Sequence, residues 1–482
     1  MDRLVVGPFN RVEGDLEVTL DVADGAVREA RVNSPLYRGF ELLLVGRDPM
    51  DALVFAPRIC GICSVSQSHA AARALAQLAG VAPPPNGRLA QNLALGCENM
   101  ADHLTHFYLF FMPDFARDCY AGRSWHKHAQ SRFRATVGGG ATAALAIRAR
   151  LLNLMGYLAG KWPHSLALQP GGSAKPVEAA ERLRMLTILH EFRAFLEQQV
   201  FGDRLEAVAA LSTESRLEAW GRAATRRKAD LPFFLRIAAD LDLANLGRAT
   251  DVFLSYGAYD GEDGPLFPQG VWDGALTPLA ANVIAEDVSH SWMVAPQAPL
   301  HPREGMTVPN ADKAGGYSWC KAPRLGGRVV ETGALARQVV AGHPLVRDLV
   351  ARSGGNVRNR VIARLLEIAL VVPHLEQWVR EIEPDAPWCT DTRLPYEGRA
   401  EGLTEAARGS LGHWVEVRRG RISNYQIVAP TTWNFSPRDA EGIPGALEQA
   451  LVGTPVEAGE TTPIAVQHVV RSFDPCMVCT VH

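Results

Sequence analysis

Two Cys-x-x-Cys pairs set the strongest constraint on how this chain can fold. Cys60 and Cys63 form the first pair, and Cys476 and Cys479 form the second, about four hundred residues further on. The spacing within each pair lets two sulfur atoms converge on one metal ion. A metal shared by both pairs would bring the two ends of the chain together inside a large core.

The four thiolates make up a soft donor set, which suits zinc, iron–sulfur, copper(I) or nickel better than magnesium or calcium. A structural zinc site stays open, although zinc modules usually draw both pairs from one short segment. A dithiol redox motif is a further alternative, but no βαβ pattern surrounds either pair. We expect the other cysteines to be buried small hydrophobic residues, namely Cys97, Cys119, Cys320 and Cys389.

Composition excludes several classes of protein. The chain has 482 residues, enough for about three domain-sized units, with 47% hydrophobic and 21% charged residues. A net charge of −3 argues against a dedicated nucleic-acid binder. No apolar run is long enough to span a membrane, and the first residues lack the pattern of a secretory signal. We expect a globular protein that does not itself insert into a membrane.

Periodicity predicts an α+β, mainly helical fold with small β elements at the N-terminus and near the C-terminus. Alternating residues around Asp24-Gly25 predict one hairpin, and a second is expected at 414–428 with its turn at Arg419-Gly420. An alanine-rich run without a helix breaker predicts a helix at 66–79, and apolar residues recurring at three- and four-residue steps predict another at 88–111. Further helices are expected at 142–160, 177–200 and 357–382.

Four segments follow from these patterns. The region 203–335 is rich in turn residues and predicts a loop- and strand-rich insertion. The others are a hairpin with the first cysteine motif (1–60), a helical core (61–202) and a helical and β part with the second motif (336–482).

The residues around both pairs resemble the signatures of nickel–iron hydrogenase large subunits. Arg58-Ile59 precedes the first pair, Asp474-Pro475 precedes the second, and Thr480-Val481-His482 follows it. Further stretches match family blocks in the same order, at 11–14, 37–41, 101–103, 106–108, 407–409 and 426–434. The resemblance covers essentially the whole chain and implies a hydrogenase large-subunit-like helical core that splits hydrogen heterolytically.

The resemblance implies a nickel–iron centre. Cys60 and Cys476 would bind nickel terminally, while Cys63 and Cys479 would bridge it to an iron with one carbon monoxide and two cyanide ligands. The unusual chemistry belongs to the cofactor, which the protein positions and tunes.

Five polar residues match family positions around that centre. Glu13 resembles the proton gate, which needs a pKa raised by burial. Arg408 resembles the arginine that lies over the open metal site, and Thr431 would help it to bind the cyanides. Asp102 and Asp474 would orient the arginine. Without the resemblance, the three carboxylates would be interpreted as ordinary surface or capping residues.

The resemblance also implies a buried magnesium ion. Glu41, the backbone carbonyl of Ile427 and His482 match its ligands. Oxygen donors and one imidazole suit a small hard cation whose shell is completed by water.

Departures from the family pattern favour a hydrogen sensor. Gln67 stands where many members have histidine, and it cannot titrate. Ile62 and Phe110 stand where uptake enzymes commonly have smaller residues at the end of the gas channel, although neutral core variation is the alternative. Ala407 replaces the proline that usually precedes the arginine in the family. A chain that stops at His482 fits either a processed form or a sensor made without a C-terminal extension.

We therefore predict a regulatory hydrogenase large subunit of low turnover. It would be cytoplasmic and would pair with an iron–sulfur small subunit, which carries the iron–sulfur clusters and passes the signal to a histidine kinase. Maturation proteins would insert the metals. The alternatives are an uptake hydrogenase feeding a respiratory chain and, more remotely, a metal-free scaffold like a complex I subunit or a structural zinc protein.

Overall fold

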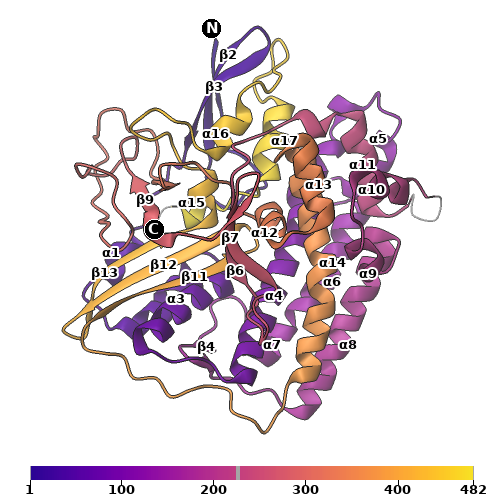
Figure 1. Ribbon diagram of the computed structural model, residues 1–482. Coiled ribbons are helices and arrows are strands. Elements are labelled where there is room, and N and C mark those ends of the chain that lie inside the picture. Colours follow the sequence, from indigo (N-terminus) through magenta and orange to yellow (C-terminus); the bar gives the residue numbers. More distant parts are fainter. Residues whose placement is uncertain (1, 224–227, 481–482) are drawn as a thin grey trace.

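A bundle of long helices forms the core of the computed structural model, which describes residues 2–223 and 228–480. Helices α4 (Pro85–Thr105) and α14 (Val357–Glu381) pack against each other, flanked by α6 (Gly139–Leu152) and α8 (Ala179–Phe195) (Figure 1). Every residue of α4 from Leu89 onward is buried, as expected of a helix at the centre of a large core.

The predicted helices are present, and their ends differ by a few residues. The first is α3 (Ser64–Ala79), and the second is α4 extended by the π-helical turn η3 (His106–Phe111). The expected helix at 142–160 is two helices, α6 and α7 (Leu154–Ala159), and α8 ends in a second π-helical turn, η6 (Leu196–Phe201). The mainly helical α+β fold class is confirmed.

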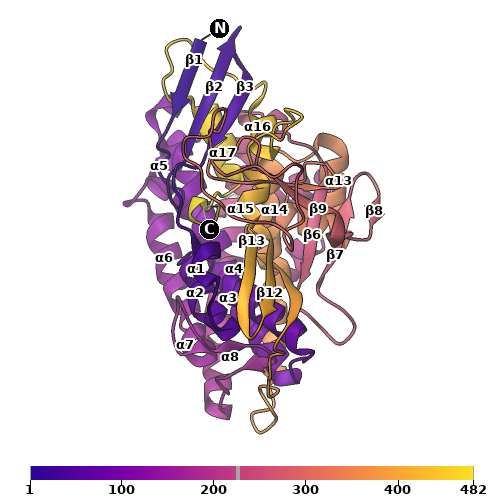
Figure 2. The ribbon, with the colours of Figure 1, turned by 90° about the vertical axis from the view of Figure 1, so that its left-hand side faces the viewer.

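The N-terminal hairpin is confirmed and gains a third strand. Strands β2 (Glu17–Ala23) and β3 (Ala26–Asn33) pair across the predicted turn, and β1 (Asp2–Val6) joins the free edge of β2. This sheet stands out from the rest of the molecule at the top of Figure 2.

The second predicted hairpin is also confirmed, within a three-stranded sheet. Strands β12 (Gly409–Arg418) and β13 (Arg421–Val428) form the hairpin, and β11 (Gly398–Ala406) pairs with β12. Strands β11 and β12 pack on α3, so this sheet covers the helix that follows the first cysteine pair (Figure 1).

The region 203–335, expected to be rich in loops and strands, begins with helices. Helices α9 (Leu205–Ala209), α10 (Glu214–Arg222) and α11 (Asp230–Asp240) precede its strands and were not predicted. Phe234, Ile237 and Ala238 are buried at helical spacing in α11, whereas the clusters of turn residues lie further along the chain. The boundaries of the four segments stay a prediction.

The remaining elements connect these parts. The helices are α1 (Phe40–Leu44), α2 (Ala52–Phe55), α5 (His126–Phe133), α12 (Ala334–Ala341), α13 (Pro344–Ser353), α15 (Pro430–Asn434), α16 (Ala446–Leu451) and α17 (Ile464–Ser472). The strands are β4 (Leu168–Gln169), β5 (Gly172–Ser173), β6 (Phe253–Ala258), β7 (Phe267–Trp272), β8 (Leu276–Thr277), β9 (Ile284–Asp287) and β10 (Ala322–Leu325). Within the described residues, no helix combines the length and apolar character needed to cross a bilayer.

The cysteines outside the two pairs divide into two kinds. Cys97 and Cys320 are buried, as predicted. Cys119 and Cys389 are exposed, so that prediction is wrong for them. Cys119 lies in the short 3-10 turn η5 (Asp118–Tyr120), and Cys389 lies in the segment between α14 and β11.

Candidate metal centre

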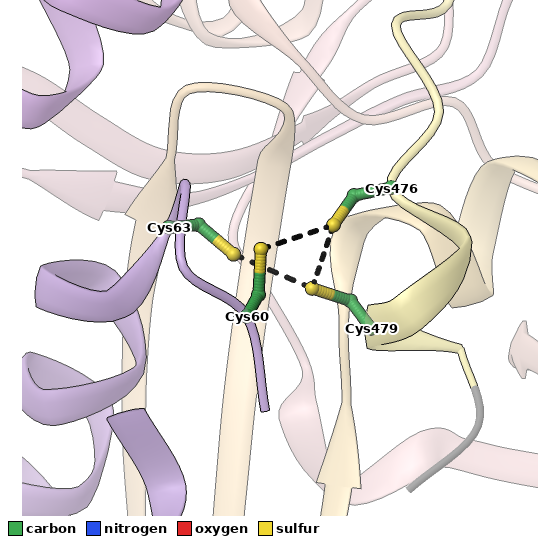
Figure 3. Close-up of side chains that lie close together, drawn as sticks. All are labelled: Cys60, Cys63, Cys476 and Cys479. Carbon is green, nitrogen blue, oxygen red and sulfur yellow. Dashed lines mark hydrogen bonds between the residues drawn. The ribbon is translucent and has the colours of Figure 1, made fainter. Parts of the chain in front are cut away.

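The two cysteine pairs meet in the interior. Cys60 and Cys63 come from the turn that leads into α3, while Cys476 directly precedes the short turn η10 (Met477–Cys479) and Cys479 is its last residue. The Sγ atoms of Cys60 and Cys476 lie 3.3 Å apart, as do those of Cys63 and Cys479, and those of Cys476 and Cys479 lie 3.0 Å apart (Figure 3). Segments from opposite ends of the chain thus contribute to a single site.

The four sulfur atoms fit a soft metal. All four lie within 4.8 Å of one another, each residue is buried, and they form the one group of this kind that the described residues contain. Hydrogen bonds from the other thiols lower the pKa of Cys60, whereas burial raises the pKa of Cys476. Four thiolates cannot share so small a buried volume without a cation to balance them. The donor set therefore fits a soft metal, as the nickel implied by the resemblance to hydrogenases requires.

Glu13 lies beside the second cysteine pair. Its backbone forms a parallel bridge with Cys476, and its carbonyl oxygen accepts a hydrogen bond of 2.7 Å from Met477 N. Gly14 has φ +79°, and a Cβ there would lie 3.0 Å from Val478, so only glycine allows this contact. Burial, and then the negative charge of Cys60, raise the pKa of Glu13. The carboxyl is thus disposed to hold a proton near the site.

Arg408 is held by two carboxylates. Its Nη1 lies 3.0 Å from Asp102 Oδ2, its Nη2 lies 3.1 Å from Asp474 Oδ1, and its Nε donates to the Asp474 carbonyl. Burial raises the pKa of Asp102 to about 7 in spite of the guanidinium. The next residue, Gly409, packs closely against Thr332, because a Cβ at Gly409 would lie only 2.4 Å from Thr332 Oγ1. The guanidinium therefore has a fixed direction.

Thr431 and Gln67 complete the surroundings of the thiols. Thr431 Oγ1 accepts a hydrogen bond of 3.1 Å from Cys476 N, which fixes the backbone of a ligand. Gln67 lies on α3 and accepts a hydrogen bond from His413. A small cavity is lined by Gln67, Arg408, Thr431 and three of the cysteines. The predicted polar residues near the thiols are thus brought together.

Two of the three predicted magnesium ligands, Glu41 and Ile427, lie in the described part of the chain and contact each other. Glu41 Oε1 accepts a hydrogen bond of 2.8 Å from the backbone N–H of Ile427, and Glu41 Oε2 lies 3.0 Å from Lys321 Nζ. Thr307 also donates to Glu41. The buried ammonium of Lys321 therefore supplies the positive charge that faces this carboxylate. His482 lies outside the described residues, and magnesium at this place stays a prediction.

The two residues proposed to narrow the gas channel are both half-buried. Ile62 packs against the apolar residues around the cysteines, and its N–H lies 3.3 Å from Cys60 Sγ. Phe110 lies in the turn η3, and its carbonyl oxygen accepts a hydrogen bond from Arg11. Their role in gas access stays a prediction.

Several residues that hold the site were missed in the sequence. Glu98 accepts hydrogen bonds from the first turn of α3, and Arg364 donates to the carbonyls of Ser472 and Phe473 just before Asp474. His413 contacts Gln67. A charged residue within an apolar helical pattern was the available signal, because buried charges need partners.

A family model described as nickel-dependent hydrogenase matches residues 38–134 and 141–482. The chain belongs to this family. It is a hydrogenase large subunit in fold and in enzyme class, and this assignment leaves the structural-zinc and metal-free scaffold alternatives without support.

Relatives match this hydrogenase over its whole length. It is 29% identical to the periplasmic NiFeSe hydrogenase large subunit of Desulfomicrobium baculatum, with 100% of this chain and 95% of that one covered. It is 28% identical to the hydrogenase-2 large chain of Escherichia coli K12, with 100% and 97% covered. The reduced Ni-Fe-Se hydrogenase of Desulfovibrio vulgaris Hildenborough has a similar structure, with a TM-score of 0.84, 29% identity and 100% of both chains covered.

Proposed function

We propose that this hydrogenase binds a nickel–iron centre through Cys60, Cys63, Cys476 and Cys479 and uses it to oxidise hydrogen. The observation that carries the proposal is the convergence of four buried thiols beside one fixed guanidinium. When bound, the centre would supply heterolytic splitting of hydrogen, and its iron would carry one carbon monoxide and two cyanides.

Residues of this chain would then accept the proton and supply a positive charge beside the centre. The Glu13 carboxyl would receive the proton, because burial and the nearby Cys60 already raise its pKa. Arg408 would place a permanent positive charge over the cavity, since Asp102 and Asp474 hold its planar guanidinium.

The electrons would leave through an iron–sulfur small subunit. The four cysteines are the one convergent group of potential ligands in the described part of the chain, so this chain offers no second cluster site there. Hydrogenase maturation proteins would assemble the centre.

We propose uptake of hydrogen as the physiological direction. The supporting observation is that relatives include an uptake hydrogenase large subunit from Azotobacter chroococcum, 28% identical with 100% of this chain and 95% of that one covered. The electron acceptor would be a respiratory chain.

A hydrogen sensor is the second candidate, and Gln67 favours it. The amide lines the cavity beside Cys63, where many family members have a titratable histidine. A sensor would turn over slowly and signal through the small subunit to a histidine kinase. Cytoplasmic location follows only from this candidate and stays a proposal.

Infrared spectroscopy of the complex with its small subunit, together with metal analysis, tests the proposal. One carbon monoxide band and two cyanide bands that shift under hydrogen are expected, with one nickel per chain. Zinc without these bands would refute the proposed centre. Turnover with artificial acceptors then separates the two candidates, because an uptake enzyme should be fast and a sensor slow.

A further inference from the structure

A buried chain of hydrogen bonds leads from the metal centre into the β11–β13 sheet. His413 Nε2 lies 2.8 Å from Gln67 Oε1, and His413 Nδ1 lies 2.8 Å from the Tyr425 hydroxyl. All three side chains are at most 1% exposed. Neither His413 nor Tyr425 was singled out by the sequence.

Gln67 connects this chain to the cysteines. It lies one helical turn after Cys63, and its N–H donates a hydrogen bond of 3.1 Å to the Cys63 carbonyl. Residues four apart share a face of a helix, so the Gln67 side chain lies on the Cys63 face of α3. It accordingly lines the cavity between the thiols.

The direction of the hydrogen bonds follows from the chemistry of each group. An amide oxygen only accepts, so Nε2 of His413 carries the hydrogen that is donated to Gln67 Oε1. In a neutral imidazole Nδ1 is then an acceptor, and the Tyr425 hydroxyl donates to it. In this tautomer the Tyr425 hydroxyl supplies the hydrogen that Nδ1 accepts, and the Nε2 hydrogen of His413 orients the Gln67 amide.

With its oxygen bound to His413, the Gln67 amide has its two hydrogens on Nε2, away from the imidazole. Among residues 2–223 and 228–480, the contact between Oε1 and His413 is the one hydrogen bond of the Gln67 side chain. The Gln67 side chain lines the same cavity as Cys63 and Cys479. A thiolate ligand is a good acceptor, and hydrogen bonds to sulfur tune a metal site.

We propose that His413 and Tyr425 are positioning residues, which hold the Gln67 amide as a hydrogen-bond donor to a thiolate ligand of the metal centre. The sheet makes this arrangement rigid. His413 pairs with Ile427 and Val415 pairs with Tyr425, so the two side chains are diagonal neighbours on adjacent strands. The inference rests on the proposed four-thiolate site. It adds the residues that orient the Gln67 amide toward that site.

The proposal predicts that loss of the Tyr425 hydroxyl changes the hydrogen bonding of the thiolates. In Tyr425→Phe, Nδ1 of His413 loses its donor, so the imidazole can move its hydrogen to Nδ1. Nε2 then becomes an acceptor, and the Gln67 amide turns to donate to it. The amide oxygen, which cannot donate, would then face the thiolates.

Cobalt(II) alone, added to the metal-free full-length chain, provides the test. Loss of a hydrogen bond makes a thiolate a stronger electron donor and moves its charge-transfer absorption to longer wavelength. We expect this shift in Gln67→Leu, and at least half of it in Tyr425→Phe. In the double variant the shift should be no larger than in Gln67→Leu, because both changes remove the same interaction.

The matched control is Tyr259→Phe, which removes another buried hydroxyl that is hydrogen-bonded to an amide, that of Asn99. It should leave the cobalt band unchanged. Additive shifts in the double variant, or no shift in Tyr425→Phe, would overturn the positioning role while leaving the four-thiolate site intact. Failure of the unaltered chain to bind cobalt through sulfur would overturn both proposals.

Discussion

Glu98 should hold the helix that follows the first cysteine pair. Its carboxylate accepts hydrogen bonds of 2.8 Å from Val65 N, 2.9 Å from Ser66 N and 3.0 Å from Trp162 Nε1. Helix α3 starts directly after Cys63, which has no side-chain hydrogen bond of its own to cap it. Glu98, from α4, therefore satisfies the free N–H groups of the first turn.

The expected cost of Glu98→Ala follows from the donors left without an acceptor. Each unsatisfied buried donor costs about 1–3 kcal/mol, so three of them near the lower limit amount to about 4 kcal/mol. In Glu98→Gln one amide oxygen can still accept, but the NH2 group faces a donor. We therefore expect this substitution to cost about 2 kcal/mol of stability. Measurements belong at about pH 8, where the carboxyl is ionised, because burial raises the pKa of Glu98 to about 7.

Hydrogen exchange of the metal-free chain, followed by mass spectrometry on peptides from α3, measures this effect. A cost of about 4 kcal/mol on opening the first turn corresponds to exchange about a thousandfold faster. We also expect the complex to retain less nickel, since Cys63 loses its support.

The matched control is Glu181→Ala in the first turn of α8. Glu181 caps the N–H of Glu178 at a partly exposed site, so its loss should cost about 1 kcal/mol and leave α3 unchanged. If exchange in the first turn of α3 were the same in Glu98→Ala as in the unaltered chain, the capping role would be refuted.

Three further changes test other parts of the molecule. Glu13→Gln should keep the metal centre but nearly abolish hydrogen–deuterium exchange with solvent, and unchanged exchange would contradict the proton role. Arg408→Lys should lower the rate of hydrogen oxidation at least about tenfold, or about 1.4 kcal/mol, because a lysine cannot contact Asp102 and Asp474 with one planar group. Burial raises the pKa of Glu448 from 4.5 to about 7, so the stability it contributes is present below 4.5 and lost as the pH rises through about 7. In Glu448→Gln thermal unfolding should therefore vary less over this range than in the unaltered chain, and an unchanged pH profile would refute the assignment.

Local patterns in the sequence determined much of the fold. The period of α4, the breaker-free run of α3 and the turns of both hairpins depend on residues close together in the chain, and each was predicted to within a few residues. The cysteine pairs were equally visible, because ligands three residues apart form a local motif. The likeness of whole blocks to a family then joined the two pairs into one site.

Only the tertiary structure decided which distant groups meet. The sequence did not predict that Lys321 would face Glu41, that Glu98 would cap α3, or that His413 would link Gln67 to Tyr425. Each contact joins residues that lie far apart along the chain or on different elements. Such contacts depend on how helices and sheets pack, and a buried polar group accepts whatever partner that packing brings within hydrogen-bond distance. Periodicity tells which face of an element is buried, but it carries no information on what that face will meet.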